Sequence, residues 1–153
     1  MNYANVPMKP YLAELNLEDI RPLNEVPIQR CDSAAGPYWT AGDFCGLGKS
    51  DILPDCDLTG LEWMGNEIRV DGPSETVKLL TRGMGIVAAW KHQMEREFSE
   101  TQFDICLSID EGDEAIPPSL TVRFWAVRDG EHYILPNAVK ESAQPVLFVF
   151  VNT

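Results

Sequence analysis

The feature that most constrains the fold of this chain is a change in the period of its hydrophobic residues after residue 99. Between residues 75 and 99, apolar residues return about every 3.6 positions, which is the period of one face of an α-helix. They are Val77, Leu80, Met84, Val87, Met94 and Phe98. Ser74 is a suitable N-cap for this helix. Gly83 and Gly85 weaken its middle and indicate either close packing on a sheet or a kink.

After the helix the period becomes two, which is typical of half-buried β-strands. In Phe103–Asp110, apolar residues at odd positions alternate with a polar face that includes Asp104 and Cys106. Further strands are predicted at 120–127, at 131–135 after an Asp129-Gly130 turn, and at Val146–Val151, which is apolar on both faces and therefore central. The sequence thus predicts an α+β fold, with one long helix packed on an antiparallel β-meander sheet.

The region before the helix is harder to interpret. Residues 58–64 and 67–70 are predicted to form a hairpin closed by a type II′ turn at Gly65-Asn66. Residues 1–57 are interrupted by prolines and are predicted to form a loop-rich N-terminal arm with one short helix at 11–20. Because aromatic residues such as Tyr38, Trp39 and Phe44 are spread through this arm, we expect it to pack on the core of a single domain spanning residues 1–153.

Composition limits the kind of partner and the compartment. The chain has 153 residues, with 12 basic and 24 acidic residues and a formal net charge of −12. Such a charge disfavours binding to nucleic acid and to anionic membranes. No signal peptide is recognisable, and the longest apolar run, Val146–Val151, is too short to span a bilayer. The four cysteines form no CxxC pair, so we expect free thiols and a cytoplasmic location.

Three motif-like patterns do not carry chemistry. Gly46-Leu47-Gly48-Lys49-Ser50 ends like a phosphate-binding loop but has Asp43 where the first glycine is required. The second pattern begins at Asp55 and matches the start of a calcium loop, through Asp57, Thr59 and Gly60, but lacks the final bidentate carboxylate. The third combines Cys106, His132 and Asp104, a thiol, a base and an acid that the sequence alone does not bring together. We therefore predict no catalytic residues, no metal and no cofactor.

The strongest functional signal is negative charge. No lysine or arginine occurs between Arg96 and Arg123, although seven acidic residues do. One interpretation is a solvated turn at residues 110–114. The other is a single partner-binding patch flanked by aromatic anchors, because tight interfaces combine aromatic anchors with charge complementarity. The residues predicted for this patch are Asp104, Asp110, Glu111, Asp113, Glu114, Trp125 and Tyr133.

These observations lead to a first functional hypothesis and two alternatives. The first is an acidic cytoplasmic protein that neutralises a basic protein partner, as an immunity or antitoxin-type inhibitor of a toxin such as a nuclease. The second is a small enzyme or ligand-binding domain with an aromatic-lined pocket, built from Trp39, Trp63, Trp90 and Trp125. The third is a structural subunit that self-assembles through Val146–Val151. The oligomeric state is left open by the sequence.

Overall fold

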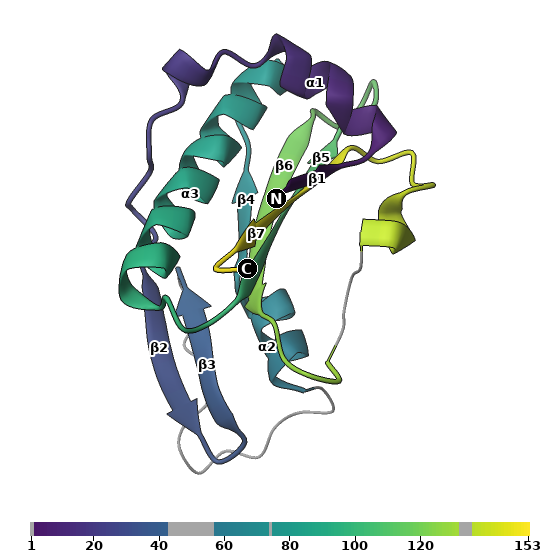
Figure 1. Ribbon diagram of the computed structural model, residues 1–153. Coiled ribbons are helices and arrows are strands. Elements are labelled where there is room, and N and C mark those ends of the chain that lie inside the picture. The colour runs from purple at the N-terminus through teal and green to yellow at the C-terminus, as the bar shows by residue number, and fades with distance from the viewer. Residues whose placement is uncertain (1, 43–56, 74, 132–135) are drawn as a thin grey trace.

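The computed structural model describes residues 2–42, 57–73, 75–131 and 136–153, and its architecture is α+β as predicted (Figure 1). A five-stranded antiparallel sheet has the strand order β1-β7-β5-β6-β4, and β2 and β3 form a second, two-stranded sheet. The strands are β1 (Asn2–Ala4), β2 (Ile28–Ser33), β3 (Gly36–Ala41), β4 (Glu67–Val70), β5 (Phe103–Asp110), β6 (Ser119–Ala126) and β7 (Val146–Val151). The helices are α1 (Lys9–Glu14), α2 (Leu58–Gly65) and α3 (Thr76–Glu97), with short 3₁₀ helices at Val6–Met8, Leu17–Asp19 and Pro136–Val139.

The long predicted helix is α3, which lies across one face of the main sheet (Figure 1). A Cβ added at Gly83 would lie 2.6 Å from Cδ2 of Leu120, so the glycine lets the helix approach the sheet closely. A Cβ at Gly85 would lie 2.4 Å from the carbonyl oxygen of Arg21, so this second glycine admits the N-terminal segment. Both glycines therefore serve close packing. The proposed N-cap, Ser74, lies outside the described residues.

The strands after α3 have the predicted alternation. Odd-numbered residues of β5, such as Ile105 and Leu107, join the core beneath α3, whereas Cys106 faces the other side of the sheet. β7 is an interior strand between β1 and β5. The strand order differs from a simple meander, because β7 returns to the far side of β5 and places β5 at the centre of the sheet.

The predicted hairpin over residues 58–70 is wrong in its first half, since Leu58–Gly65 is the helix α2. The Asp57 side chain accepts a hydrogen bond from the backbone N–H of Gly60 at 2.8 Å and so caps the helix. All five residues from Leu58 to Glu62 are buried, so no one-sided apolar period marks this helix in the sequence. β4 is a strand as predicted, but it pairs with β6.

The N-terminal arm contains more regular structure than the sequence indicates. β1 pairs with β7 and adds an edge to the main sheet, while β2 and β3 form a hairpin. The short helix begins earlier than predicted, at Lys9, and ends at Glu14. Four residues of the described part of the arm belong to the main hydrophobic core, namely Met8, Ile28, Trp39 and Ala41.

Candidate functional site

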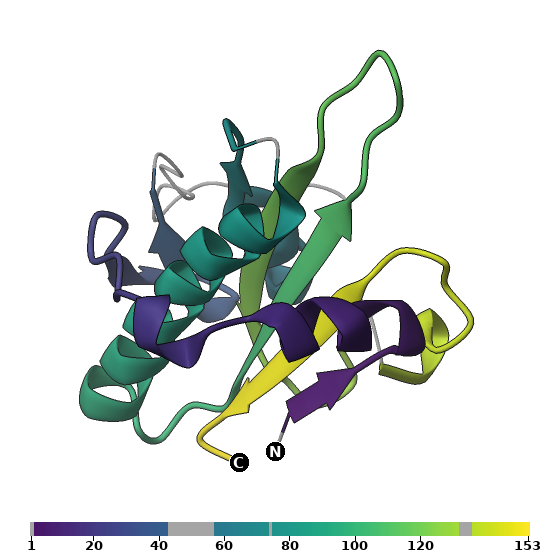
Figure 2. The same cartoon turned by 90° about the horizontal axis from the view of Figure 1, so that it is seen from above.

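Four of the seven residues predicted for the patch lie together at residues 110–118, the last residue of β5 and the loop that joins it to β6, hereafter the acidic loop. Asp110, Glu111, Asp113 and Glu114 are all exposed there. The loop projects beyond the body of the molecule as an extension of the β5–β6 hairpin (Figure 2). β5 and β6 are in register from Phe103 opposite Ala126 to Asp110 opposite Ser119, so a continuous ladder supports the base of the loop.

Hydrogen bonds to its own aspartates fix the shape of the acidic loop. Oδ1 of Asp110 accepts from the backbone N–H of Gly112 at 2.9 Å. Oδ1 of Asp113 accepts from the backbone N–H groups of Ala115 at 2.7 Å and Ile116 at 2.8 Å. Gly112 has φ +69°, and a Cβ there would lie 2.2 Å from the carbonyl oxygen of Ile116. The acidic charges are therefore carried on an ordered turn.

Among the described residues, these acidic charges have no counter-ion. Within the described parts of the chain, none of the seven ion pairs includes Asp110, Glu111, Asp113 or Glu114. The Tyr11 hydroxyl, from α1, donates a hydrogen bond to Oε1 of Glu111. That bond is the main reason why the pKa of Tyr11 is raised to about 12, with burial and the negative charges of Glu111 and Glu14 adding to the effect. The loop is a region of concentrated negative potential.

The other three predicted residues are placed differently. Asp104 precedes Asp110 by six residues along β5, a separation of roughly 20 Å in an extended strand. Trp125 pairs with Asp104 in the register, but only 3% of its surface is exposed, because it packs edge-on against Phe148. Tyr133 lies outside the described residues. The structure therefore gathers the four loop acids and does not gather all seven residues into one patch.

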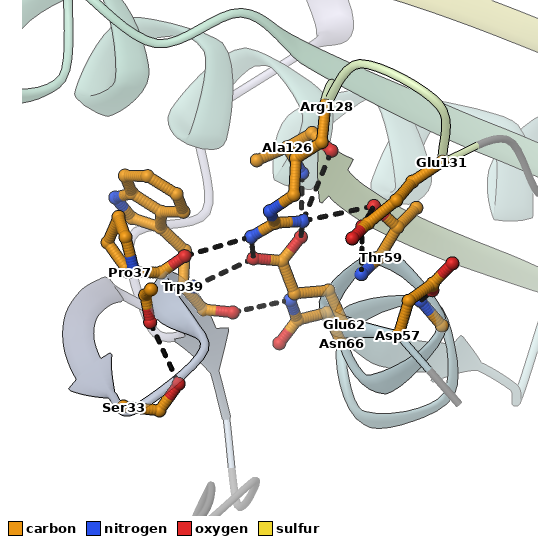
Figure 3. Close-up of polar contacts among 12 residues, drawn as sticks. Ser33, Pro37, Trp39, Asp57, Thr59, Glu62, Asn66, Ala126, Arg128 and Glu131 are labelled. Carbon is orange, nitrogen blue, oxygen red and sulfur yellow. Dashed lines mark hydrogen bonds and ion pairs between the residues drawn. The ribbon is translucent and has the colours of Figure 1, made fainter. Parts of the chain in front are cut away.

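A second polar cluster, which the sequence analysis missed, is buried where α2, β3 and the end of β6 meet (Figure 3). Glu62 is 0% exposed, and its carboxylate accepts four hydrogen bonds. Oε1 accepts from the backbone N–H of Trp39 at 3.0 Å and from Nη2 of Arg128 at 2.6 Å. Oε2 accepts from the backbone N–H of Ala126 at 2.7 Å and from Nη1 of Arg128 at 2.9 Å.

Arg128 extends this buried cluster to neighbouring groups. It donates to the carbonyl oxygen of Pro37 at 3.1 Å and to Oγ1 of Thr59 at 3.1 Å, and Thr59 Oγ1 donates to Glu131 at 2.5 Å. Burial raises the pKa of Glu62, while Arg128 and the two backbone N–H groups oppose that rise. Because both carboxylate oxygens are occupied by donors, Glu62 joins structural elements and is not free to act as a base.

Asn66, one helical turn after Glu62, completes the cluster. Its Oδ1 accepts from the backbone N–H of Ala41 at 3.0 Å, and its Nδ2 donates to the carbonyl oxygen of Trp39 at 2.8 Å. We call these three side chains, Glu62, Asn66 and Arg128, the buried clasp. The clasp forms hydrogen bonds with the N–H and C=O groups of β3 that point away from β2. An acidic residue within the apolar run 58–64 was the sequence signal for this clasp, but its partners could not be read from the sequence.

The residues considered for chemistry lie partly inside and partly outside the described residues. Burial raises the pKa of the Cys106 thiol to about 12, so it stays protonated at neutral pH and is a poor nucleophile. His132 and the Gly46–Ser50 pattern lie outside the described residues, as does Asp55. Asp57 and Thr59 belong to the start of α2, so they do not form a calcium loop. Among described residues, no group of three His, Cys, Asp or Glu side chains is placed to hold a metal ion.

Three of the four tryptophans are buried, and they belong to two different hydrophobic clusters. Trp39, Trp90 and Trp125 are each buried in the core, at 5%, 1% and 3% exposure. Trp90 Nε1 donates to the carbonyl oxygen of Val26 at 2.9 Å, and Trp63 lies under the guanidinium of Arg123 at 4.1 Å from the ring centroid. In the part of the chain that the structure covers, no helix has the length and apolar character needed to cross a membrane.

Comparison with known proteins identifies a family but no characterised relative. Residues 53–153 match the uncharacterized protein PM0498 family, and this match covers well over half of the sequence. The chain therefore belongs to that family. No curated protein and no solved structure matches the chain. The matched region contains the acidic loop and Glu62, Asn66 and Arg128, whereas the β3 segment that these three side chains bind lies before it.

Proposed function

We propose that this chain is a cytoplasmic binding protein, without enzymatic activity of its own, that neutralises a basic protein partner. Its closest functional description is an immunity or antitoxin-type inhibitor of a toxin such as a nuclease. The observation that carries this proposal is the acidic loop, in which four exposed carboxylates have no counter-ion among the described residues. Nucleases need a cationic surface to hold phosphate backbones, and such a surface is complementary to this loop.

The order of the loop supports the same proposal. Asp110 and Asp113 each use one oxygen for backbone hydrogen bonds, so the loop is folded before a partner arrives. A preformed surface loses less conformational entropy on binding than a flexible one. The free thiols of Cys31 and Cys106 agree with a reducing compartment such as the cytoplasm.

The decisive experiment is affinity capture from lysate of the source cells with a loop variant as the comparison. The variant is D110N/E111Q/D113N/E114Q, in which asparagine retains the Oδ1 acceptors that fold the loop. We expect the wild-type chain to retain one basic protein in stoichiometric amount, and the variant to lose it. Retention should also fall at high salt, because exposed charges are screened over about 8–10 Å at physiological ionic strength.

A matched control removes the same number of charges elsewhere. Glu25, Asp32, Glu100 and Asp129 are exposed and lie outside the acidic loop. Their combined neutralisation changes the net charge as much as the loop variant does. If the control variant loses the captured protein equally, net charge and not the loop governs binding, and the assignment of the loop fails. If the wild-type chain retains no basic protein from cells that express the neighbouring genes, the inhibitor proposal itself fails.

The alternative of an aromatic-lined ligand pocket has less support. Three of the four tryptophans contribute to the core, and Trp63 stacks with Arg123. The self-assembly alternative is also weakened, because both sides of β7 are already paired, with β1 and with β5.

A further inference from the structure

The edge of the main sheet at β4 is open in the described structure. β4 pairs with β6 on one side, and no described strand pairs with its other side. An unpaired edge presents backbone N–H and C=O groups that a further extended segment can bind. Recognition by strand addition takes affinity from these main-chain hydrogen bonds and specificity from pockets for alternate side chains. Such a pocket lies beside this edge.

The pocket is a notch of about 310 Å³ with both apolar and charged walls, the charged ones being Glu25, Arg69, Asp71 and Arg82. It is lined by apolar side chains from three segments, namely Leu23, Val26, Ile68, Val70 and Ile86. One wall is held in place, since the backbone N–H of Leu23 donates to the carbonyl oxygen of Gly85 on α3 at 3.0 Å. Ile68 and Val70 point to the same side of β4, so the notch runs along the strand. Its volume is at the lower end of the range for small-ligand sites.

A cationic side chain stands at one end of the notch. Arg82 of α3 lines it, and its Nη1 lies 3.5 Å from the carbonyl oxygen of Asp71, where β4 has just ended. The neighbouring Arg69 is neutralised by Asp71 at 3.0 Å, whereas Arg82 takes part in no ion pair with a described residue. The Arg82 guanidinium has no ion-pair partner among the described residues and stands beside the apolar part of the notch, so it is complementary to a carboxylate that adjoins an apolar group.

We propose that the β4 edge binds the C-terminal segment of a partner protein in extended form, a site separate from the acidic loop. The terminal carboxylate would lie on Arg82, and the apolar side chain of the last residue would fill the notch. Because Arg82 stands at the Asp71 end of β4, the bound segment runs parallel to β4 with its C-terminus beside that end. Its backbone pairs with the outer side of Glu67–Val70.

The test uses the full chain and two acetylated hexapeptides of alternating threonine and valine. One ends in a valine carboxylate, and the other has the same sequence with a C-terminal amide. Isothermal titration gives their affinities, and backbone amide NMR shifts locate the binding. We expect the free acid to shift the amides of residues 67–71 and to bind at least about tenfold more tightly than the amide, as expected for loss of one charge-assisted contact.

Two variants separate a local effect from a general one. R82Q removes the guanidinium charge at an exposed position, and it should bring the affinities of acid and amide together while leaving the melting temperature unchanged. K78Q removes a charge from the same helix outside the notch, and it should retain the difference between the two peptides.

Several results would overturn the proposal. These are equal binding of acid and amide by the wild-type chain, no binding of either, or a preference for the acid that survives in R82Q. Decanoate binding as tightly as the peptide acid would assign the notch to free apolar acids and remove the need for a strand. A dimer that dissociates in I68E, detected by sedimentation, would assign the edge to a second copy of the chain.

Discussion

Glu62 and Asp113 are both carboxylates that accept backbone hydrogen bonds, but the charge of Glu62 is buried and paired with a cation, whereas that of Asp113 is exposed. Glu62 is 0% exposed, and the guanidinium of Arg128 compensates it at 2.6 Å. Asp113 is exposed, folds a turn, and has no cation beside it among the described residues. The buried clasp uses charge to join three elements, whereas the charge of the acidic loop stays exposed, as the proposed partner-binding role requires.

The two carboxylates differ in how much the fold would lose in stability if each stood without a cation. A buried ion without a partner destabilises the fold by several kcal/mol, whereas exposed charges change stability little. The clasp should therefore dominate stability, and the loop should dominate binding.

The largest effect is expected from Arg128→Met, which leaves the Glu62 carboxylate buried without its counter-ion. We expect the free energy of unfolding in urea to fall by about 3–5 kcal/mol. The matched control is Arg30→Met, because Arg30 forms an exposed pair with Asp32 at 3.5 Å. The control should change stability by less than about 1 kcal/mol. Similar losses in both variants would contradict the division.

The next effect concerns Asn66. Asn66→Ala leaves the N–H of Ala41 and the carbonyl of Trp39 buried without partners, which should cost about 1–3 kcal/mol for each unsatisfied group. Hydrogen exchange of the Ala41 amide should accelerate accordingly. Asn24→Ala, at an exposed position, provides the control. An unchanged exchange rate at Ala41 would mean that Asn66 does not secure β3.

A smaller, local effect is expected in the acidic loop. Asp113→Ala removes the acceptor for two backbone N–H groups and should speed hydrogen exchange at Ala115 and Ile116, with a loss of about 1 kcal/mol in stability. Asp113→Asn retains the acceptor and should preserve slow exchange while losing the charge. If the two variants exchange alike, the aspartate does not fold the loop.

The smallest effect concerns Tyr11, whose pKa is raised to about 12 by its bond to Glu111. The folded state holds this proton more tightly than the unfolded state, so the contribution to stability is complete below about pH 10 and is lost as the pH rises toward 12. Tyrosinate absorbance, with Tyr11→Phe subtracted, gives the pKa. In Glu111→Gln it should move back toward 10, and an unmoved value would show that Glu111 is not the cause.

Long, regular patterns were predictable from the sequence. α3, β5, β6 and β7 span enough residues for their periods to be recognised, and each lies within two residues of its predicted bounds. α2 was missed because eight residues with a buried glutamate give too little periodicity to separate a helix from a strand. The strands of the arm were missed for a similar reason, since β1 has three residues and β3 contains a proline.

The candidate site was predictable only where the relevant residues are neighbours in the chain. The acidic loop is one continuous segment, so its composition was enough to identify it. The clasp joins Glu62 to Arg128 across 66 positions, and that pairing exists only in the folded molecule. Whether Trp125 is an exposed anchor depended on what covers the sheet face opposite α3, which no local pattern encodes.

The spacing of Glu62 and Asn66 has a consequence for solubility. Four residues of helix rise about 6 Å, close to the advance of about 7 Å over two residues of a strand. Glu62 therefore reaches the N–H of Trp39, and Asn66 reaches the N–H of Ala41 and the carbonyl of Trp39, while Arg128 binds the carbonyl of Pro37. The three side chains of the clasp thus take the place of a strand that would otherwise continue the small sheet. A strand whose edge is covered in this way cannot pair with a strand of another copy and start an aggregate. The clasp therefore opposes aggregation as well as stabilising the fold.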